Sequence, residues 1–267
     1  MIYEIKRTEC DRLFFDHVVT EDMQTGAYVS HTHSAYELLY VVNGDVTLTV
    51  EDRRYKLKKD DLAIIKPLDH HYVRIDAECE YDRYNFLFNP TALGINNIGA
   101  LPEGLEVCNC RMSPILCELV KKTDYYKTHL SPESFEDIVG ALIKELIYNL
   151  SIFSKQQTDA KHRSPSNPLI SAALEVINAE INTQVSVSDI ASKLFVTKSY
   201  LHRIFKSELG ITPAKYILEK RILTARNMLL FGKLPTEVYS ECGFSDYTSF
   251  YRAYVRYFGY PPSKERA

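Results

Sequence analysis

Hydrophobic and polar residues alternate in short runs along residues 36–88. The runs are YELLYVV, VTLTVED, RRYKLKK, DLAIIKP, HHYVRI and YDRYNFLF, and turn-forming pairs such as Asn43-Gly44 and Glu51-Asp52 lie between them. Short runs rich in β-branched and aromatic residues, repeated about every 8 to 12 residues, are typical of a β-sandwich or β-barrel. The pattern therefore predicts a small all-β unit over roughly residues 5–110.

A helical periodicity begins after Ser131-Pro132-Glu133. Apolar residues then recur at the spacing i, i+3, i+4 and i+7, at Phe135, Ile138, Val139, Leu142, Ile143, Leu146, Ile147 and Leu150. This spacing predicts an amphipathic helix, and a shorter helix is expected over residues 113–126. The apolar stripe has two interpretations, which are burial against the β unit and pairing with its twin in a dimer.

The stretch SKQQTDAKHRSPSNP that ends at Pro168 is polar and has no apolar period, which is typical of a linker. Beyond it the sequence is helical and contains an internal repeat. Asp189-Ile190-Ala191 corresponds to Glu237-Val238-Tyr239 at an offset of 48 residues. At an offset of 49, Leu201, Arg203, Phe205, Gly210 and Pro213 correspond to Phe250, Arg252, Tyr254, Gly259 and Pro262. Such a period indicates two copies of one supersecondary unit.

Each copy predicts a short helix, a tight turn and a second helix that ends at a glycine, which is the helix-turn-helix pattern. The first copy is expected to have helices over residues 188–194 and, after a cap at Thr197, to Glu208. The second is expected to have helices over residues 236–242 and, after a turn at Gly243-Phe244, from Ser245 to Phe258. One extra residue in the second copy lies in the turn or at the start of its second helix. A helix over residues 213–230, with Pro213 in its first turn, should join the copies.

The composition indicates what class of protein the chain is. The 267 residues are 45% hydrophobic and 25% charged, which is ordinary globular usage and suits two domains. The apolar runs are far shorter than a membrane span, and no secretory signal is visible at the N-terminus, so we expect a cytoplasmic protein with no membrane partner. Six cysteines in such a chain are expected to be thiols rather than a disulfide framework.

The charge is divided unevenly. The net charge is −3, but residues 168–267 contain 13 Lys and Arg against 9 Asp and Glu, and residues 1–167 contain 19 against 26. An acidic first part and a basic second part indicate that only the second part meets a polyanion.

A helix-turn-helix places its second helix in the major groove of DNA. Arg203 and Arg252 hold equivalent outward positions and are the best candidates for reading guanine, because a guanidinium donates two hydrogen bonds to that base. The residues expected beside them on the same faces are Ser199, His202, Tyr247, Thr248 and Tyr251. Lys198, Lys206 and Arg256 are expected to contact phosphates, as are the backbone amides at the helix starts, Thr197 and Ser245.

Histidines in the β half form a second candidate site. His31-x-His33-x3-Glu37 is followed later by His71. In a strand, side chains at i and i+2 point the same way, so His31 and His33 can converge, and Glu37 and His71 would complete a set that suits iron, manganese, zinc or nickel. The alternative is that these residues bind a polar ligand or one another. His70 should point to the opposite side.

A small barrel can hold one small ligand. Tyrosine is abundant, with 19 residues and no tryptophan, and suits carbohydrate binding. Besides the histidines and Glu37, the candidate lining residues are Tyr36, Tyr72, Arg74, Arg83 and Tyr84, of which Tyr36 and Arg83 are favoured for effector binding.

Residues 170–267 resemble the DNA-binding region of the AraC/XylS family of bacterial transcription regulators. The resemblance is carried by DIASKLFVTKSYLHRIFKSELGITPAKYILEKRILTARNMLL and CGFSDYTSFYRAYVRYFGYPP. It implies two helix-turn-helix units joined by the long helix, entering successive major grooves, with Ser199, His202, Arg203, Thr248 and Arg252 at the base-facing positions. The sequence departs from the family at Tyr239, Val255 and Glu265, where Ala, Lys and Tyr are usual.

The histidine spacing resembles the two metal motifs of cupin barrels, with departures at Asp60 and at Leu68-Asp69. The family often carries such a sensor domain, which implies a small effector, often a sugar, and a helical dimer contact. The expected fold is therefore α+β. Its predicted parts are a cupin-like effector-sensing β-barrel (residues 1–110), a helical dimerisation segment (111–153), a linker (154–167) and an all-α DNA-binding domain with a tandem helix-turn-helix (168–267).

We therefore expect a sequence-specific, effector-controlled transcription regulator without enzymatic activity. Its expected partners are promoter DNA, a small molecule such as a sugar, a second copy of the chain and, for an activator, RNA polymerase. The first alternative is a metal-dependent cupin enzyme with a DNA-binding appendage, which rests on the four ligand types alone. The second is a constitutive DNA-binding protein with a structural cupin. The sequence selects neither the effector, the operator nor activation over repression.

Overall fold

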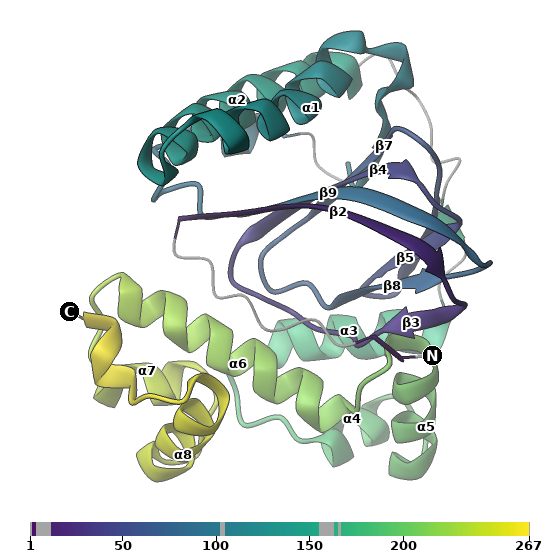
Figure 1. The fold of residues 1–267 in the computed structure, drawn as a ribbon. Coiled ribbons are helices and arrows are strands. Elements are labelled where there is room, and N and C mark those ends of the chain that lie inside the picture. Colours follow the sequence, from purple (N-terminus) through teal and green to yellow (C-terminus); the bar gives the residue numbers. More distant parts are fainter. Residues whose placement is uncertain (1, 4–11, 102–104, 155–162, 165–166, 267) are drawn as a thin grey trace. The chain divides into compact units, whose positions relative to one another are not determined.

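The computed structural model describes residues 2–3, 12–101, 105–154, 163–164 and 167–266 (Figure 1). Contacts within the chain divide it into two compact units, residues 1–29 with 33–164 and residues 30–32 with 165–267. Two β-sheets and a pair of helices build the first unit, and helices build the second, so the chain has the predicted mixed class. No helix in the described part of the chain is long and apolar enough to cross a lipid bilayer.

The strands of the first unit form two sheets. Their bounds are β1 (Ile2–Tyr3), β2 (Leu13–Met23), β3 (Gly26–Tyr28), β4 (Tyr36–Asn43), β5 (Val46–Val50), β6 (Arg53–Leu57), β7 (Asp61–Ile65), β8 (His71–Ile75), β9 (Cys79–Phe88), β10 (Val107–Asn109) and β11 (Arg163–Ser164). A six-stranded sheet has the order β1-β3-β8-β5-β6-β11, and a five-stranded sheet has the order β10-β7-β4-β9-β2. Each of the six alternating runs overlaps one of the strands β4 to β9, in the same order, which confirms the predicted cupin-like β fold.

The five-stranded sheet is buried on both faces. Leu38 and Tyr40 of β4 belong to a cluster that includes residues of two helices, α1 (Pro114–His129) and α2 (Pro132–Ser154), which lie over this face (Figure 1). Leu39 and Val41 belong to a second cluster, which extends to strands of the six-stranded sheet. We call the face that carries Leu39 and Val41 the inner face, because it faces the other sheet.

The apolar stripe of α2 is buried within the first unit. Phe135, Val139, Ile143, Ile147 and Leu150 are each at most 7% exposed and pack in the cluster formed by α1, α2 and the five-stranded sheet. The first interpretation of the stripe, burial against the β unit, is therefore the one that the structure adopts. These side chains are not available to a twin helix, so a dimer contact on α2 would need its other side.

The predicted linker lies mostly outside the described residues. Arg163 and Ser164, which are described, form β11 and pair antiparallel with β6. All cysteines within the described ranges, namely Cys79, Cys108, Cys110, Cys117 and Cys242, are free thiols.

The second unit contains six helices among its described residues. They are α3 (Pro168–Glu180), α4 (Val187–Lys193), α5 (Lys198–Leu209), α6 (Pro213–Leu230), α7 (Pro235–Glu241) and α8 (Tyr247–Phe258), followed by a short 3-10 helix (Pro262–Arg266). The predicted joining helix over residues 213–230 is confirmed as α6. Helices α4 and α7 have 7 residues each, and α5 and α8 have 12 each. The extra residue of the second copy lies in the turn, since four residues separate α4 from α5 and five separate α7 from α8.

The start of α8 differs from the prediction. Asp246, rather than Ser245, is the N-cap, and its carboxylate accepts a hydrogen bond from the backbone amide of Ser249 at 2.8 Å. Ser245 lies one residue outside and donates its hydroxyl to Asp246. A carboxylate is as good a cap as a hydroxyl and also suits the positive end of the helix dipole. The helix therefore begins at Tyr247, two residues after the predicted start.

Candidate functional site

Local sequence signals hold the second helix of each helix-turn-helix. Thr197 caps α5 by accepting a hydrogen bond from the amide of Tyr200 at 3.2 Å. Gly210 and Gly259 end α5 and α8 in the left-handed conformation, at φ of 72° and 85°. Both helices therefore have fixed starts and ends, which fixes the direction of the side chains between them.

The two helices expose equivalent arginines. Leu201 and Phe205 of α5, and Phe250 and Tyr254 of α8, are fully buried. Arg203 and Arg252 lie between these pairs in sequence and are exposed, and the guanidinium of Arg203 lies 5.1 Å from the centroid of the Tyr200 ring. The other candidate DNA-contacting residues are exposed as well, except His202, which is half-buried: Thr197, Lys198, Ser199, Lys206, Ser245, Tyr247, Thr248, Tyr251 and Arg256.

Helix α6 ties the two copies together. Its first half supplies Tyr216 and Ile217 to the core built with α3, α4 and α5. Its second half supplies Ile222 and Leu229 to the core built with α7 and α8. The 18 residues of α6 span about 27 Å.

The structure accommodates two of the three sequence departures. Tyr239 is half-buried in the core of the second copy, and its ring meets that of Tyr247 edge-on at 6.1 Å. Glu265 pairs with the buried Arg226 of α6 at 2.9 Å. Sequence reasoning gave Glu265 no role, because its partner lies 39 residues away. Val255 is half-buried on α8.

The four predicted metal ligands come together. Their ligand atoms all lie within 4.8 Å of one another, from the side chains His31, His33, Glu37 and His71. The segment between β3 and β4 supplies two of them, β4 supplies Glu37, and β8 begins with His71. The two upstream histidines are thus outside a regular strand, yet they converge as predicted. His70 is buried but is not part of the group.

Glu37 is the centre of this group. Its Oε2 lies 2.8 Å from His33 Nε2 and 3.0 Å from His71 Nε2. Burial alone would raise the pKa of Glu37, but the charge of His71 and the hydrogen bonds from both imidazoles outweigh it and hold that pKa well below its ordinary value. Burial likewise opposes the charged form of His71, but the charge and hydrogen bond of Glu37 raise its pKa.

Backbone carbonyls orient both imidazoles. The Nδ1 atom of His33 lies 3.0 Å from the carbonyl oxygen of Ala35, and that of His71 lies 3.0 Å from the carbonyl oxygen of Asp69. A carbonyl only accepts, so Nδ1 carries the proton and donates in each ring. The Nε2 atoms therefore face the centre of the group, which is the arrangement of metal-binding histidines whose other nitrogen is held by a backbone oxygen. The residues present fit a divalent metal.

Of the five candidate lining residues, only Arg83 lies on the inner face. Tyr36 stacks on Phe88 at 5.8 Å, in the cluster with the helices. Tyr84 also belongs to that cluster and donates its hydroxyl to Asp124 of α1 at 2.6 Å. The other two, Tyr72 and Arg74, alternate along β8 with Val73 and Ile75, which pack between the sheets, so they lie on the opposite face of the six-stranded sheet.

The sequence pattern did not indicate two further residues of β9 that lie on the inner face. Tyr81 and Asn85 flank Arg83 at two-residue spacing. Buried polar atoms of all three side chains, namely the Tyr81 hydroxyl, Arg83 Nη1 and Asn85 Oδ1, lack a hydrogen-bond partner. Alternate residues of a strand point to the same face, so their two-residue spacing from Arg83 is the signal that could have identified Tyr81 and Asn85.

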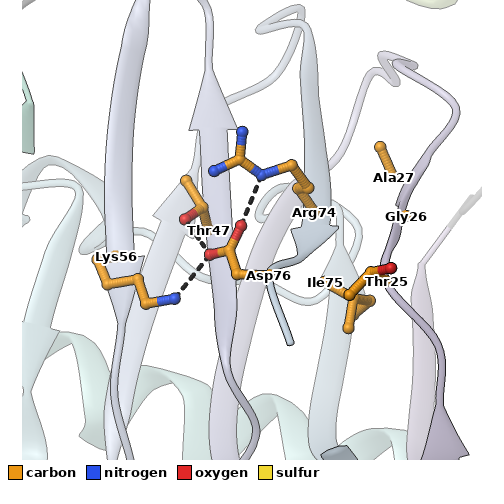
Figure 2. A pocket seen from close by; sticks show the side chains of 8 residues that line it. All are labelled: Thr25, Gly26, Ala27, Thr47, Lys56, Arg74, Ile75 and Asp76. Atoms are coloured by element: carbon orange, nitrogen blue, oxygen red, sulfur yellow. Dashed lines mark hydrogen bonds and ion pairs between the residues drawn. The ribbon is translucent and has the colours of Figure 1, made fainter. Parts of the chain in front are cut away.

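Figure 2 shows a pocket on the opposite face of the six-stranded sheet. Its lining residues are Thr25, Gly26, Ala27, Thr47, Lys56, Arg74, Ile75 and Asp76. Asp76 accepts hydrogen bonds from Thr47, Lys56 and Arg74. Burial alone would raise the pKa of Asp76, but these three donors outweigh it and lower that pKa. The charged groups here are already paired with one another, unlike Arg83.

Both halves of the chain match described families. Residues 15–102 match the family described as AraC-like ligand binding domain, and residues 190–267 match the family described as helix-turn-helix domain. The Msm operon regulatory protein of Streptococcus mutans is 24% identical over 257 residues, which are 95% of this chain and 92% of the relative. The HTH-type transcriptional activator RhaR of an Enterobacter species is 22% identical over 263 residues, which are 93% of this chain and 90% of the relative.

Among solved structures, ToxT from Vibrio cholerae O395 is similar at a TM-score of 0.40 and 11% identity, over 95% of this chain and 96% of its own.

Proposed function

The chain belongs to the AraC-type family of DNA-binding transcription regulators, and we propose that a small polar molecule held at the inner face of the first unit controls its binding to promoter DNA. The observation that carries the DNA half of this proposal is the pair Arg203 and Arg252, equivalent and exposed on two capped, well-packed helices. The effector half rests on the polar groups of the inner face. On this proposal the chain is a regulator and not an enzyme.

We assign direct base contacts to the two arginines and to their neighbours Ser199, His202 and Thr248. Tyr247 and Tyr251 flank Arg252 on the exposed face of α8 and complete the reading surface. Positive side chains at Lys198, Lys206 and Arg256, with the amides at the starts of α5 and α8, would hold phosphates. Because α6 packs in the cores of both copies, it joins the two reading helices, which supports simultaneous binding in successive major grooves.

The test is an electrophoretic shift of the full chain on DNA upstream of its own gene. Arg203→Ala and Arg252→Ala should each weaken specific binding roughly tenfold or more, because a bidentate arginine–guanine contact contributes about 1–3 kcal/mol. Lys233→Ala is the matched control, since Lys233 also carries one positive charge in this unit but pairs with Glu241. Unchanged affinity in both arginine variants would refute the assignment.

We further propose that His31, His33, Glu37 and His71 hold a divalent transition metal. The converging Nε2 atoms and the buried carboxylate support this. The metal would supply a positive charge that orients oxygen atoms of the effector. Such a group by itself would also suit a metal-dependent enzyme, but the relatives of this chain are transcription regulators.

The metal proposal is tested by equilibrium dialysis of tag-free protein against Zn²⁺, Mn²⁺, Fe²⁺ or Ni²⁺, followed by metal analysis. We expect about one ion per chain, lost in His33→Ala. His129→Ala is the control, because His129 is an exposed histidine on α1. Equal metal content in all three proteins would contradict the site.

We also propose that the regulator is a cytoplasmic homodimer that contacts RNA polymerase where it activates. The dimer contact would use the exposed side of α2, where Ile138, Tyr148 and Ile152 are 37%, 55% and 59% exposed. Their spacing of 10 and 4 residues places them near one side of a helix. Tyr148→Glu should then shift the chain toward monomer in sedimentation.

A further inference from the structure

Arg83 lies on the inner face of β9 without an acidic partner. Its guanidinium is 4.7 Å from the Tyr81 ring centroid and 5.5 Å from that of Tyr28 on β3. The residues paired with it on the two neighbouring strands are Val18 and Val41. No carboxylate of the described residues forms an ion pair with Arg83, and its Nη1 is buried without a hydrogen bond.

The nearby acids are accounted for. Glu37 is engaged by His33 and His71. Asp16 of β2 pairs in register with Asn85 rather than with Arg83, and it is exposed. Arg83 is half-buried, and its buried Nη1 is a charged donor without an acceptor, which is unfavourable unless an anion satisfies it. The planar donors of a guanidinium match a carboxylate.

The neighbours of Arg83 specify what should flank that anion. Burial raises the pKa of Tyr81, so its hydroxyl keeps the proton and can donate. Asn85 Oδ1 is a buried acceptor without a partner, so a hydroxyl group of the bound molecule could donate a hydrogen bond to it. Tyr81 and Asn85 are four residues apart on one strand, or about 13 Å, which is the length of a small molecule.

We infer that the effector is a hydroxylated carboxylic acid, such as a sugar acid, whose carboxylate binds Arg83 and whose hydroxyl donates to Asn85. This inference rests on the proposed function, because it names the chemical class of that effector. A neutral sugar would leave the guanidinium without a counter-charge. The charged pocket of Figure 2 lacks this property, since Asp76 already neutralises Arg74 there.

The first test is a thermal-shift comparison of the full chain with matched compounds. Gluconate is compared with glucitol, and galacturonate with galactose, each at a concentration about 100 times a weak Kd of roughly 0.1 mM. We expect a higher melting temperature with at least one acid and no shift with its neutral counterpart. Arg83→Gln should abolish the shift, and Arg54→Gln, on a strand of the other sheet, should keep it.

The second test needs no ligand. Arg83→Met removes the unsatisfied guanidinium and should raise the ligand-free melting temperature by about 2–4 °C. Arg74→Met, which breaks the pair with Asp76, should lower it. A structural role for the stacking of Arg83 on Tyr81 predicts the reverse for Arg83→Met.

The inference is overturned if neutral sugars act as well as their acids, if no acid produces a shift, or if Arg83→Met lowers the ligand-free melting temperature. These outcomes are distinct from failure of the proposed function. That failure would show as loss of specific DNA binding by the wild-type chain, or as a neutral or acidic ligand that binds without changing DNA affinity.

Discussion

Phe195 and Gly243 occupy equivalent positions in the two helix-turn-helix turns, each two residues after the end of the first helix, and both have a positive φ, of 55° and 75°. Glycine adopts this conformation freely, whereas a bulky side chain does so at a cost. The side chain of Phe195 is also 96% exposed. The first turn thus carries a strained aromatic residue where the second carries glycine.

We expect Phe195→Gly to stabilise the second unit by about 1 kcal/mol, since it relieves a strain of about 1–2 kcal/mol and loses little packing. The measurement is calorimetry of the full chain, reading the transition that bound DNA shifts. Phe231→Gly is the matched control, because Phe231 is 84% exposed but has an ordinary φ of −80°. Stabilisation by both substitutions, or by neither, would contradict the assignment of strain to Phe195.

Gly243 has a second reason to be glycine. A Cβ there would clash with the carbonyl oxygen of Thr183 and lie 2.7 Å from that of Ile181. Those carbonyls also accept hydrogen bonds from Arg221 of α6, so the backbone has little freedom to move away. The second turn is therefore packed against the segment between α3 and α4, which helps to fix the two copies relative to each other.

Gly243→Ala should destabilise the second unit by about 2–5 kcal/mol, the sum of backbone strain and overpacking. Gly232→Ala separates the two contributions. Gly232 also has a positive φ, of 88°, but a Cβ added there would have nothing within 4 Å. The control should cost only about 1–2 kcal/mol. Equal losses of melting temperature in the two variants would show that the close contact contributes nothing.

The pair Arg226–Glu265 anchors the C-terminal end of the second unit. Both side chains are 5% exposed, and the same Glu265 oxygen accepts hydrogen bonds from Tyr254 and Tyr260, each at 2.7 Å. Burial and the hydrogen bond to Glu265 raise the pKa of Tyr254, so its hydroxyl remains a donor. Three side chains from three parts of the chain, Arg226, Tyr254 and Tyr260, thus depend on one carboxylate.

Glu265→Gln should lower the unfolding free energy by about 3 kcal/mol, because it leaves a buried guanidinium without its counter-charge. Adding Arg226→Met should recover much of that loss, since an apolar side chain needs no partner. Urea unfolding of the two single variants and the double variant gives the coupling between the two positions. Strictly additive losses would mean that the two side chains do not stabilise each other.

The fold was predictable wherever local pattern and packing agree. The bounds of α6 follow from Thr212 and Pro213, which cap and start the helix, and its apolar residues serve two cores. The start of α8 was less certain, because Ser245 and Asp246 are adjacent residues that both form good caps. Only the hydrogen bond from Ser249 distinguishes them.

The inner face was harder to predict, for a physical reason. In β4, residues 37–41 are all buried, so hydrophobicity does not show which alternate set faces the other sheet. Tyr36 was therefore assigned to the lining although it lies on the helix side. For β9, too, the placement of Tyr81 and Asn85 depends on which alternate set of residues faces the other sheet. The histidine group was predictable because chemically matched side chains recur at short spacing.

The pocket of Figure 2 has a pH-dependent contribution to stability. Asp76 has a lowered pKa, so its ionised form stabilises the folded state above the ordinary carboxyl pKa of about 4, and this stabilisation is lost as the pH falls through the lower folded value. Lys56 and Arg74 are about half exposed, at 49% and 52%, so the contribution is about 1 kcal/mol or less.

Asp76→Asn should therefore be less stable than wild type at pH 7, and the two proteins should converge as the pH falls below the ordinary carboxyl pKa of about 4. Urea unfolding of the first unit at each pH measures the difference between them. Repeating the measurement in about 1 M NaCl should shrink the gap at pH 7, because salt screens exposed pairs. A gap of constant size from pH 7 to pH 3 would show that Asp76 stabilises the sheet through shape rather than charge.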